Sequence, residues 1–449
     1  MTDLAARVSA LLPGVVEDLT ALVAIPSVSS LPDRHGDVER TVEAVSALLS
    51  DLHCPDVQVV REGGQPAIIA RFPAPEGQPT VCLYAHLDVQ PTGDLSLWSS
   101  DPFVATRRGE RLYGRGVVDD KAGIAVHLAA LRAFDGKPPV GVTLFIEGEE
   151  EIGSPTLSDI LARHADALTS DVFVICDSGN WLVGTPAFTT ALRGLVDLVV
   201  QVDTLDHALH SGQFGGVAPD ALTTLIRLLA TLHDDAGDVA VEGLAHAEPF
   251  NLDYPQDRIA EEAGLLPGVR LTGTGPIADR VWGRPSITVL ALDATSVADA
   301  SNTLSPTARA KVSMRIAPNQ DPQAALAALR AHLIDHAPFG AKVTMTDGST
   351  GSGTVVEMAG PVAELARTVY SDAFRNPVVD MGQGGSIPMV ADFQRAYPSA
   401  QILVTGVSDP DSRMHGIDES LDLIDLEAAS LAEASLLQGL ADQTNGRSA

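Results

Sequence analysis

The sequence contains little cysteine, and what it has does not form the pattern of a disulfide framework. The three cysteines, Cys54, Cys82 and Cys176, lie far apart in the chain, and two of them stand inside apolar, strand-like runs. Disulfide-stabilised folds instead carry closely spaced, even sets of cysteines in short secreted chains. We therefore expect small buried thiols in a reducing compartment.

Basic residues are also scarce, and long apolar runs are missing. Lys and Arg number 29 against 59 Asp and Glu, which gives a formal net charge of -30. This charge repels nucleic acid and anionic membrane surfaces at long range, so it excludes both as partners and leaves a small molecule or a peptide. No stretch of 18 apolar residues occurs, and the N-terminus has no basic segment followed by an apolar one. We therefore expect a cytoplasmic protein without a membrane anchor.

The residues that are abundant indicate an α/β protein. Hydrophobic residues make up 45% of the chain, and its 449 residues exceed one ordinary core, which predicts at least two domains. Helical patterns alternate with short strands in the first third of the sequence. Four near-continuous apolar runs are typical of buried parallel strands. These runs cover residues 80–85, 142–146, 172–176 and 401–407.

Acidic residues and histidines collect just past these strands. The first three strands are followed by "HLD", "EGEEE" and "DSG", and the fourth is followed by "SDPDSRMHGIDES". In open α/β sheets, ligands bind beyond the carboxyl ends of the strands. Three adjacent glutamates, Glu149 to Glu151, would repel one another if they were buried together. We therefore expect them at the rim of a site, beside water or a cation.

A second domain is indicated between about residues 190 and 350, where elements follow in the order β-α-β-β-α-β. That order is typical of a ferredoxin-like α+β domain, here inserted into the first domain. We predict a catalytic domain with a mostly parallel central sheet flanked by helices, formed by residues 1–188 and 353–449. The inserted domain would cover residues 189–352.

Several side chains are candidate metal ligands, and each has an ordinary structural alternative. In "YAHLDVQP", His86 and Asp88 lie on one face of a strand end, where the carboxylate can hold the imidazole ring. The alternative is a plain polar strand end. Asp119 and Asp120 stand at the expected start of a helix, where carboxylates also serve as caps. The same alternatives, solvated or capping groups, apply to Glu150, Glu151, Asp177 and His415.

The combination of these residues predicts a dinuclear metal site. Two histidines and several carboxylates form a ligand set for zinc above all, with manganese or cobalt able to substitute. Five ligands indicate two ions, and a bridging carboxylate would let the ions share a hydroxide whose pKa falls toward neutrality. A neighbouring glutamate that does not ligate would serve as general base. Consecutive glutamates therefore predict one base and one ligand.

The motifs together resemble those of the dinuclear-zinc dipeptidase family, which includes carnosinases and cytosolic nonspecific dipeptidases. Glutamate carboxypeptidase, aminoacylase, acetylornithine deacetylase and succinyl-diaminopimelate desuccinylase are relatives of that family. The resemblance runs in the family's order from His86 to His415, nearly the whole chain. The six motifs that carry it are "YAHLDVQP", "LYGRGVVDDKAG", "EGEEEIGS", "CDSG", "LHSGQFGG" and "GGSIP".

The resemblance implies a role for each residue of the metal site. Glu150 would be the general base, and Asp88 would orient the catalytic groups. The peptide bond between Asp119 and Asp120 is expected to be cis. The implied ligands are His86 and Asp177 for one metal ion, Glu151 and His415 for the other, and Asp119 as the bridge.

The resemblance also implies that the inserted domain is a lid that carries the contact of a homodimer. His210 in "LHSGQFGG" matches a histidine that reaches the partner subunit's site and stabilises the oxyanion there. Arg315 matches a lid arginine that grips the substrate carboxylate, although a solvated strand residue is the alternative. Asn302 is a further candidate on the lid. Backbone N–H groups for a carboxylate would come from the turn that contains Gly384, Gly385 and Ser386.

These residues predict hydrolysis of an amide bond in a dipeptide or a similar small amino-acid conjugate. N-acyl amino acid deacylase and carboxypeptidase are alternatives with the same metal chemistry, and a noncatalytic metal-dependent ligand-binding protein is a third. Dipeptidases of the family often carry an acidic residue before "GGSIP", where this chain has Gln383, so recognition of a free α-amine stays open. A serine hydrolase is excluded because Pro388 stands where its nucleophile turn needs glycine.

Overall fold

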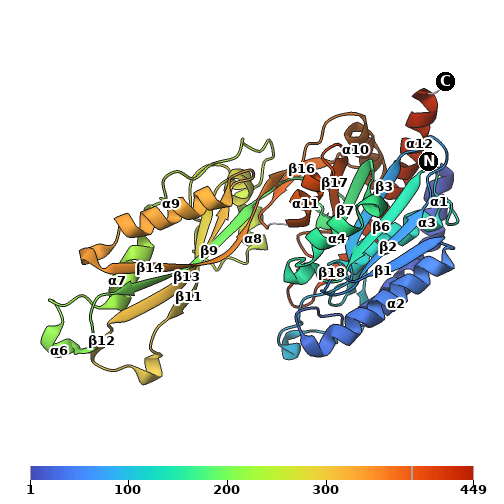
Figure 1. The fold of residues 1–449 in the computed structure, drawn as a ribbon. Helices are drawn as coiled ribbons and strands as arrows, with labels where there is room; N and C mark the ends of the chain where they lie inside the picture. Colours follow the sequence, from blue (N-terminus) through green and yellow to red (C-terminus); the bar gives the residue numbers. More distant parts are fainter. Residues whose placement is uncertain (1, 386–387, 448–449) are drawn as a thin grey trace. The chain divides into compact units, whose positions relative to one another are not determined.

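The computed structural model describes residues 2–385 and 388–447 and divides the chain into two compact units. The first unit comprises Met1–Thr190, Val356–Met381 and Met389–Ala449, and the second comprises Ala191–Val355 and Gly382–Pro388. Figure 1 labels most of the helices and strands of both. The segment Gly382–Pro388, which we predicted to be part of the catalytic domain, thus groups with the second unit.

The first unit is built around a six-stranded sheet in the order β1-β2-β6-β3-β7-β17. Strands β6, β3, β7 and β17 run parallel, whereas β2 is antiparallel to β6 and β1 is antiparallel to β2. The parallel strands contain the four apolar runs, so the prediction of a mostly parallel central sheet flanked by helices is confirmed. The strands are β1 (Asp56–Val60), β2 (Ala67–Phe72), β3 (Thr80–His86), β6 (Gly141–Glu147), β7 (Val172–Gly179) and β17 (Gln401–Ser408).

Helices cover both faces of this sheet, which explains why its strands are apolar on both sides. One face packs against α1, α2, α3, α10 and α12 through residues such as Leu83 and Val174. On the other face, Phe393 of α11 contacts the ring of Tyr84. None of the described helices is long and apolar enough to cross a lipid bilayer. The helices are α1 (Thr2–Val23), α2 (His35–Asp51), α3 (Lys121–Arg132), α4 (Leu157–Arg163), α5 (Ala165–Leu168), α10 (Pro361–Phe374), α11 (Pro388–Ala396) and α12 (Leu423–Arg447).

Polar contacts fix the central helix α3 between its neighbours. Its residues from Lys121 to Leu131 are all buried. Lys121 Nζ donates to the carbonyl oxygens of Leu22 and Ile25 at the end of α1, both at 2.8 Å. The buried His127 contacts Glu433 of α12 at 2.9 Å. Because buried polar groups are costly when unpaired, these contacts hold α3 in one position relative to α1 and α12.

Two three-stranded sheets organise the loops around the larger one. In the sheet β18-β5-β4, Ser420 of β18 pairs with Tyr113 of β5, so the loop that enters β18 lies beside the loop that leaves β5. The sheet β15-β8-β16 lies where the chain passes between the two units, and Leu192 of β8 pairs with Thr354 of β15. The strands are β4 (Thr106–Arg108), β5 (Arg111–Tyr113), β8 (Ala187–Leu192), β15 (Thr354–Val355), β16 (Val379–Gln383) and β18 (Ser420–Asp422).

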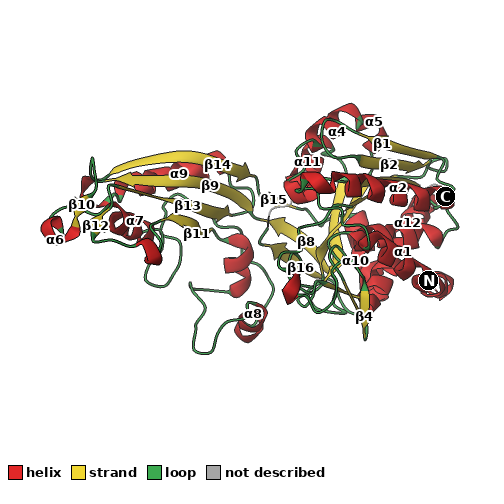
Figure 2. Cartoon of the chain, turned by 90° about the horizontal axis from the view of Figure 1, so that it is seen from below, coloured by secondary structure: helices red, strands yellow, loops and turns green. Residues whose placement is uncertain are grey.

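The second unit contains an antiparallel sheet in the order β11-β13-β9-β14, with α7 and α9 packed on one of its faces (Figure 2). Alternate residues of β9, such as Leu198 and Val200, are buried in that face. The chain order β9-α7-β11-β13-α9-β14 agrees with the predicted element order. The elements are β9 (Gly194–Asp203), β10 (Leu209–His210), α6 (Ser211–Phe214), α7 (Ala221–Ala230), α8 (Gln256–Glu262), β11 (Ser286–Asp293), β12 (Thr303–Leu304), β13 (Thr307–Ile316), α9 (Pro322–Asp335) and β14 (Lys342–Gly351).

The assignment of a buried and a half-buried face to β9 can be tested by substitution. Leu198 is fully buried, whereas Gln201 lies on the opposite, half-buried side of β9. We expect Leu198→Ala to lower the free energy of unfolding of this unit by about 2–5 kcal/mol, because the substitution leaves a cavity. Gln201→Ala should change it by about 0.5 kcal/mol or less. Urea unfolding followed by circular dichroism measures both, and equal losses would contradict the assignment of the two faces.

Candidate metal centre

The predicted ligands converge in the first unit, at the carboxyl ends of the parallel strands. His86 ends β3, Asp177 lies near the end of β7, and a short 3-10 helix, Glu150–Ile152, follows β6. The other two ligands, Asp119 and His415, come from loops that the sheet β18-β5-β4 brings together. The five predicted ligands are His86, Asp119, Glu151, Asp177 and His415, and Glu150, the predicted base, lies among them.

Two overlapping groups of ligand atoms share His86. In one group, His86 Nε2 lies 3.8 Å from Asp177 Oδ1 and 3.9 Å from Glu150 Oε2. In the other, the members are His86, Asp119 and Glu151, whose ligand atoms lie within 4.8 Å of one another. Each group offers the nitrogen and oxygen atoms that borderline divalent metals prefer.

Asp119 stands between the two histidines. Its Oδ1 is 3.1 Å from His86 Nε2, and its Oδ2 is 2.9 Å from His415 Nε2. His415 Nε2 also lies 3.2 Å from Glu151 Oε2. One carboxylate with one oxygen turned toward each histidine is the arrangement that a ligand bridging two ions needs.

The charges of the cluster show why it suits cations. Burial raises the pKa of Glu150 to about 7 and holds that of Asp177 well above its ordinary value, with neighbouring carboxylates adding to both shifts. Burial alone would lower the pKa of His86, but hydrogen bonds with Asp119 and Asp88 raise it well above its ordinary value. Hydrogen bonds with Asp119 and Glu151 raise the pKa of His415 to about 10. Divalent ions would relieve the repulsion between these buried carboxylates and take the place of the ring protons.

Asp88 orients both sides of the site. Its two carboxylate oxygens accept hydrogen bonds from the backbone N–H groups of Glu150 and Glu151, at 3.2 and 3.1 Å. Its backbone oxygen lies 3.0 Å from His86 Nδ1. Asp120 accepts a hydrogen bond from the backbone N–H of His86 at 3.2 Å, and the peptide bond between Asp119 and Asp120 is cis, as predicted.

A buried ion pair that the sequence did not reveal supports the same site. Glu419 accepts hydrogen bonds from Arg115 Nη1 at 2.5 Å and from the backbone N–H groups of Val118 and Asp119 at 3.1 and 3.3 Å. Arg115 Nη2 donates to the carbonyl oxygen of His415 at 3.2 Å. His415 itself has a φ of 61°, a conformation that non-glycine residues adopt only when their surroundings hold them there. The pair therefore fixes the Asp119 loop and the His415 loop together.

A third supporting residue was also missed. Gln90 Nε2 donates to Glu151 Oε2 at 2.8 Å and so orients this carboxylate. The signal available in the sequence was position alone: Gln90 follows Asp88 in "HLDVQP", Arg115 precedes Asp119 by four residues, and Glu419 follows His415 by four.

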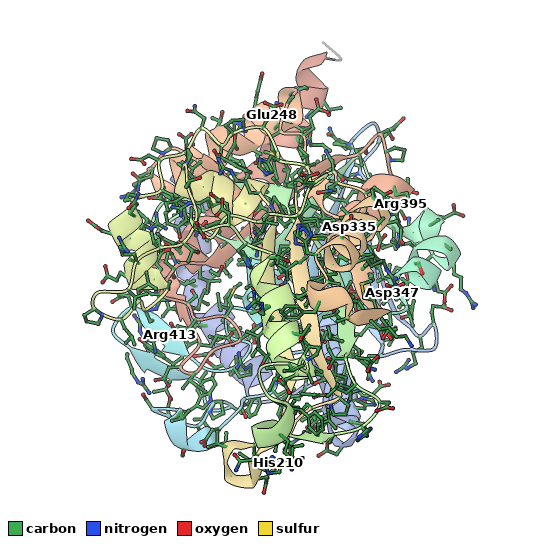
Figure 3. The ribbon with its side chains drawn as sticks, turned by 90° about the vertical axis from the view of Figure 1, so that its left-hand side faces the viewer. His210, Glu248, Asp335, Asp347, Arg395 and Arg413 are labelled. Carbon is green, nitrogen blue, oxygen red and sulfur yellow. The ribbon has the colours of Figure 1, made fainter. Side chains whose placement is uncertain are left out.

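The remaining predicted residues lie in the second unit. His210 is exposed at the turn between β10 and α6, where Figure 3 shows it pointing outward, and its ring accepts a hydrogen bond from the N–H of Gly212. Asn302 is also exposed. It lies beside His210, since its backbone carbonyl accepts a hydrogen bond from the N–H of Ser211. Arg315 stands at the far end of β13 from Thr307, a separation on the order of 25 Å at the usual rise of a strand. The structure thus keeps His210 and Asn302 apart from Arg315 within one chain.

The glycine turn is described in part. Gly384 and Gly385 follow β16, and Ser386 lies outside the described residues.

Comparisons with known proteins show the family and the fold of the chain. Residues 82–439 match the family model described as "Peptidase family M20/M25/M40". A cysteinylglycine-S-conjugate dipeptidase of Corynebacterium striatum is 33% identical over 430 residues, which cover 94% of each chain. Two solved structures share the fold: the di-peptidase Dug1p from Saccharomyces cerevisiae, with a TM-score of 0.80, 24% identity and 98% of each chain covered, and human carnosine dipeptidase 1, with a TM-score of 0.78, 23% identity, and 98% of this chain and 99% of that one covered.

Replacement of Glu419 tests whether the buried pair holds the metal centre. In Glu419→Gln, one carboxylate oxygen becomes an amide that cannot accept from the loop N–H groups. We expect the affinity for Zn²⁺ to fall about 10- to 100-fold, as is usual when a residue that orients metal ligands is lost. Competition with a chromogenic chelator measures this on protein whose folding is verified by circular dichroism.

The matched control is Glu364→Gln, an exposed glutamate on α10. Its affinity for Zn²⁺ should equal that of the wild type. A Glu419→Gln variant that is folded and binds Zn²⁺ as tightly as this control would show that the pair has no role in holding the ligands.

Proposed function

The chain belongs to peptidase family M20/M25/M40, and we propose that it is a metallodipeptidase that hydrolyses the amide bond of dipeptides at the centre in its first unit. The observation that carries this proposal is the pair of adjacent glutamates, Glu150 and Glu151, which Asp88 holds beside the shared ligand His86. A base next to a ligand is what hydrolysis of an amide requires, because a proton must move from water to the leaving nitrogen.

Each residue of the centre has a proposed part. His86, Asp177, Glu151 and His415 would hold two divalent ions, and Asp119 would bridge them. Bound there, the ions would acidify a water molecule and polarise the substrate carbonyl. We propose zinc as the working ion because the nitrogen and carboxylate ligands suit it, with manganese or cobalt able to replace it.

Glu150 would be the group that moves the proton. Its carboxylate is largely buried beside the ligands, and burial brings its pKa to about 7, near the value at which a group both takes and gives a proton at neutral pH. Asp88 keeps its backbone in place through the N–H of Glu150. The backbone N–H of Glu151 donates to the other oxygen of Asp88, so one carboxylate positions both the base and the ligand.

We further propose that the protein works as a homodimer. His210 and Asn302 stand at one end of β13 and Arg315 at the other, so one chain does not offer both ends to one substrate. A second copy would supply His210 to the site, where it would stabilise the oxyanion. Arg315 would bind the substrate carboxylate. The free thiols Cys54, Cys82 and Cys176 favour a reducing, cytoplasmic location.

The substrate class can be tested with a defined panel. Protein loaded with Zn²⁺ should release amino acids from free dipeptides, including Cys-Gly and β-Ala-His, which appear in the names of related proteins. The panel should also contain N-acetylated dipeptides and N-acyl amino acids. Removal of metal with a chelator should abolish release, and restored Zn²⁺ should recover it. Preference for the acylated compounds would contradict a dipeptidase and favour a deacylase or carboxypeptidase.

Separate replacement of Glu150 and Glu151 tests whether Glu150 acts as a base and not as a metal ligand. Glu150→Gln should lower kcat about 10²- to 10⁴-fold, because proton transfer is lost, while the content of bound Zn²⁺ is unchanged. Glu151→Gln should lose bound Zn²⁺ as well as turnover. Metal analysis and steady-state kinetics on both variants give the answer. A Glu150→Gln variant with full turnover, or one that has lost zinc, would remove Glu150 from the proposed role.

Mixing two inactive variants tests the homodimer. In a mixture of His210→Ala and Glu150→Gln, half of the dimers would contain one of each and keep one intact site in two. After subunit exchange, the activity should therefore rise to about a quarter of the wild-type value. Unmixed variants and a mixture kept below the exchange temperature are the controls. Activity that stays at the level of the single variants would exclude His210 acting across subunits.

A further inference from the structure

A cavity in the second unit has no part in the proposed hydrolysis. Its volume is about 500 Å³, which lies within the range of small-molecule sites. It is bounded by residues 286–288 at the start of β11, by the loop 233–239 that follows α7, and by the turn 272–274. All of these segments belong to the second unit, so the cavity shares no residue with the metal centre.

Two arginines that line this cavity are held by one turn of the chain. Arg280 Nη1 donates to the carbonyl oxygens of Thr272 and Gly273. Arg284 Nη1 donates to that of the next residue, Thr274, at 2.9 Å. Three consecutive carbonyl oxygens therefore fix the two guanidinium groups at the cavity, and their other N–H groups are left for further partners.

The one acid of the cavity, Asp238, is engaged by the same turn. Its carboxylate accepts hydrogen bonds from the backbone N–H of Thr274 at 3.1 Å and from the hydroxyl of Thr274 at 2.6 Å. These hydrogen bonds, and then the charges of Arg284 and Arg280, lower the pKa of Asp238. Among the described residues, no carboxylate forms an ion pair with either arginine. The lining thus has two guanidinium charges against one carboxylate, in a chain with 59 acidic and 29 basic residues.

The cavity also has more donors than the protein itself satisfies. Arg280 Nε is buried and has no hydrogen-bond partner in the described part of the chain, which is unusual for a buried donor. A Cβ atom on Gly275, whose φ is 82°, would lie 2.8 Å from Arg284 Nη2, so the glycine leaves this nitrogen uncovered. His233 and His246 line the cavity as well, and an imidazole N–H is a further donor. Such a set of donors suits an anion.

We infer that this cavity binds a phosphate group, free or carried by a small molecule, with Arg280 and Arg284 as its main donors. A guanidinium fork matches two phosphate oxygens, and the oxygens of a phosphate point in several directions, so that two arginines and an imidazole can bind at once. A carboxylate has two oxygens in one plane and a single charge. The volume leaves room for a small organic group beside the phosphate.

The experiment is isothermal titration calorimetry of Zn²⁺-loaded protein with inorganic phosphate. Phosphate can also bind zinc ions, so wild type is compared with Arg280→Gln and Arg284→Gln, which leave the metal centre unchanged. Each substitution should weaken binding at the cavity about 10- to 100-fold, the usual loss for a hydrogen bond to a charged group. Acetate should bind wild type at least about tenfold more weakly than phosphate, because it engages fewer donors.

The matched control is Arg309→Gln, which removes an exposed arginine of the same unit that is paired with Asp293. It should bind phosphate as wild type does. Arg280→Lys, which keeps the charge but not the fork, should lie between wild type and Arg280→Gln. It serves as the test, together with Arg284→Gln, if circular dichroism shows that Arg280→Gln is unfolded.

Ribose 5-phosphate, with ribose as its neutral control, distinguishes the two sources of the phosphate group. Binding tighter than that of inorganic phosphate would support a phosphorylated small molecule, and weaker binding would support the free anion.

Three results would overturn the inference. One is wild-type protein that binds no phosphate at about 10 mM, a concentration that reveals even weak affinity. Another is equal binding by wild type and the folded arginine variants, which would assign the phosphate to the metal centre. The third is acetate bound as tightly as phosphate. Loss or absence of dipeptidase activity has no bearing on these results, because only binding is measured.

Discussion

The buried ion pair between Arg115 and Glu419 is the contact on which the metal centre depends. It joins two loops that are 300 residues apart in sequence, one that leaves β5 and one that enters β18, and these two strands are paired. One loop carries Asp119, whose carboxylate lies between the two histidines, and the other carries His415. A buried pair of this kind is a weak source of stability, since desolvation of both charges offsets much of their attraction. Its role here is positional, because the hydrogen bonds of Glu419 and Arg115 hold the two loops in one arrangement.

The second constraint is charge. The parallel strands bring carboxylates from β6, β7 and two loops to one edge of the sheet, and the low polarity of the surroundings makes their repulsion strong. The backbone N–H groups of Glu150 and Glu151, which donate to Asp88, and a hydrogen bond from Gln90 to Glu151 orient these carboxylates but do not neutralise them. Divalent cations at the proposed centre would neutralise them.

Much of this could be predicted from sequence, because the ligands follow the strands. His86, Glu150, Glu151 and Asp177 stand directly past apolar runs, and the edge at which parallel strands end is the same for all of them. The residues that were missed, Arg115, Gln90 and Glu419, share a different property. Most of their contacts are with backbone groups, and the positions of such groups depend on loop conformation, which neither hydrophobic period nor spacing records. The grouping of Gly382–Pro388 with the second unit had no signal either, since it follows from strand pairing across long separations.

The path of the chain through β8 and β15 has a consequence for how such proteins diversify. The chain enters the inserted unit along β8 and leaves it along β15, and Leu192 and Thr354 pair across the two strands. The ends of the insertion therefore lie about 5 Å apart, the width of a hairpin. A domain whose chain is interrupted over so short a distance tolerates an insertion at that place, because the two strand ends stay together. Substitutions can therefore accumulate in the inserted unit without disturbing the strands of the first unit that end at His86 and Asp177.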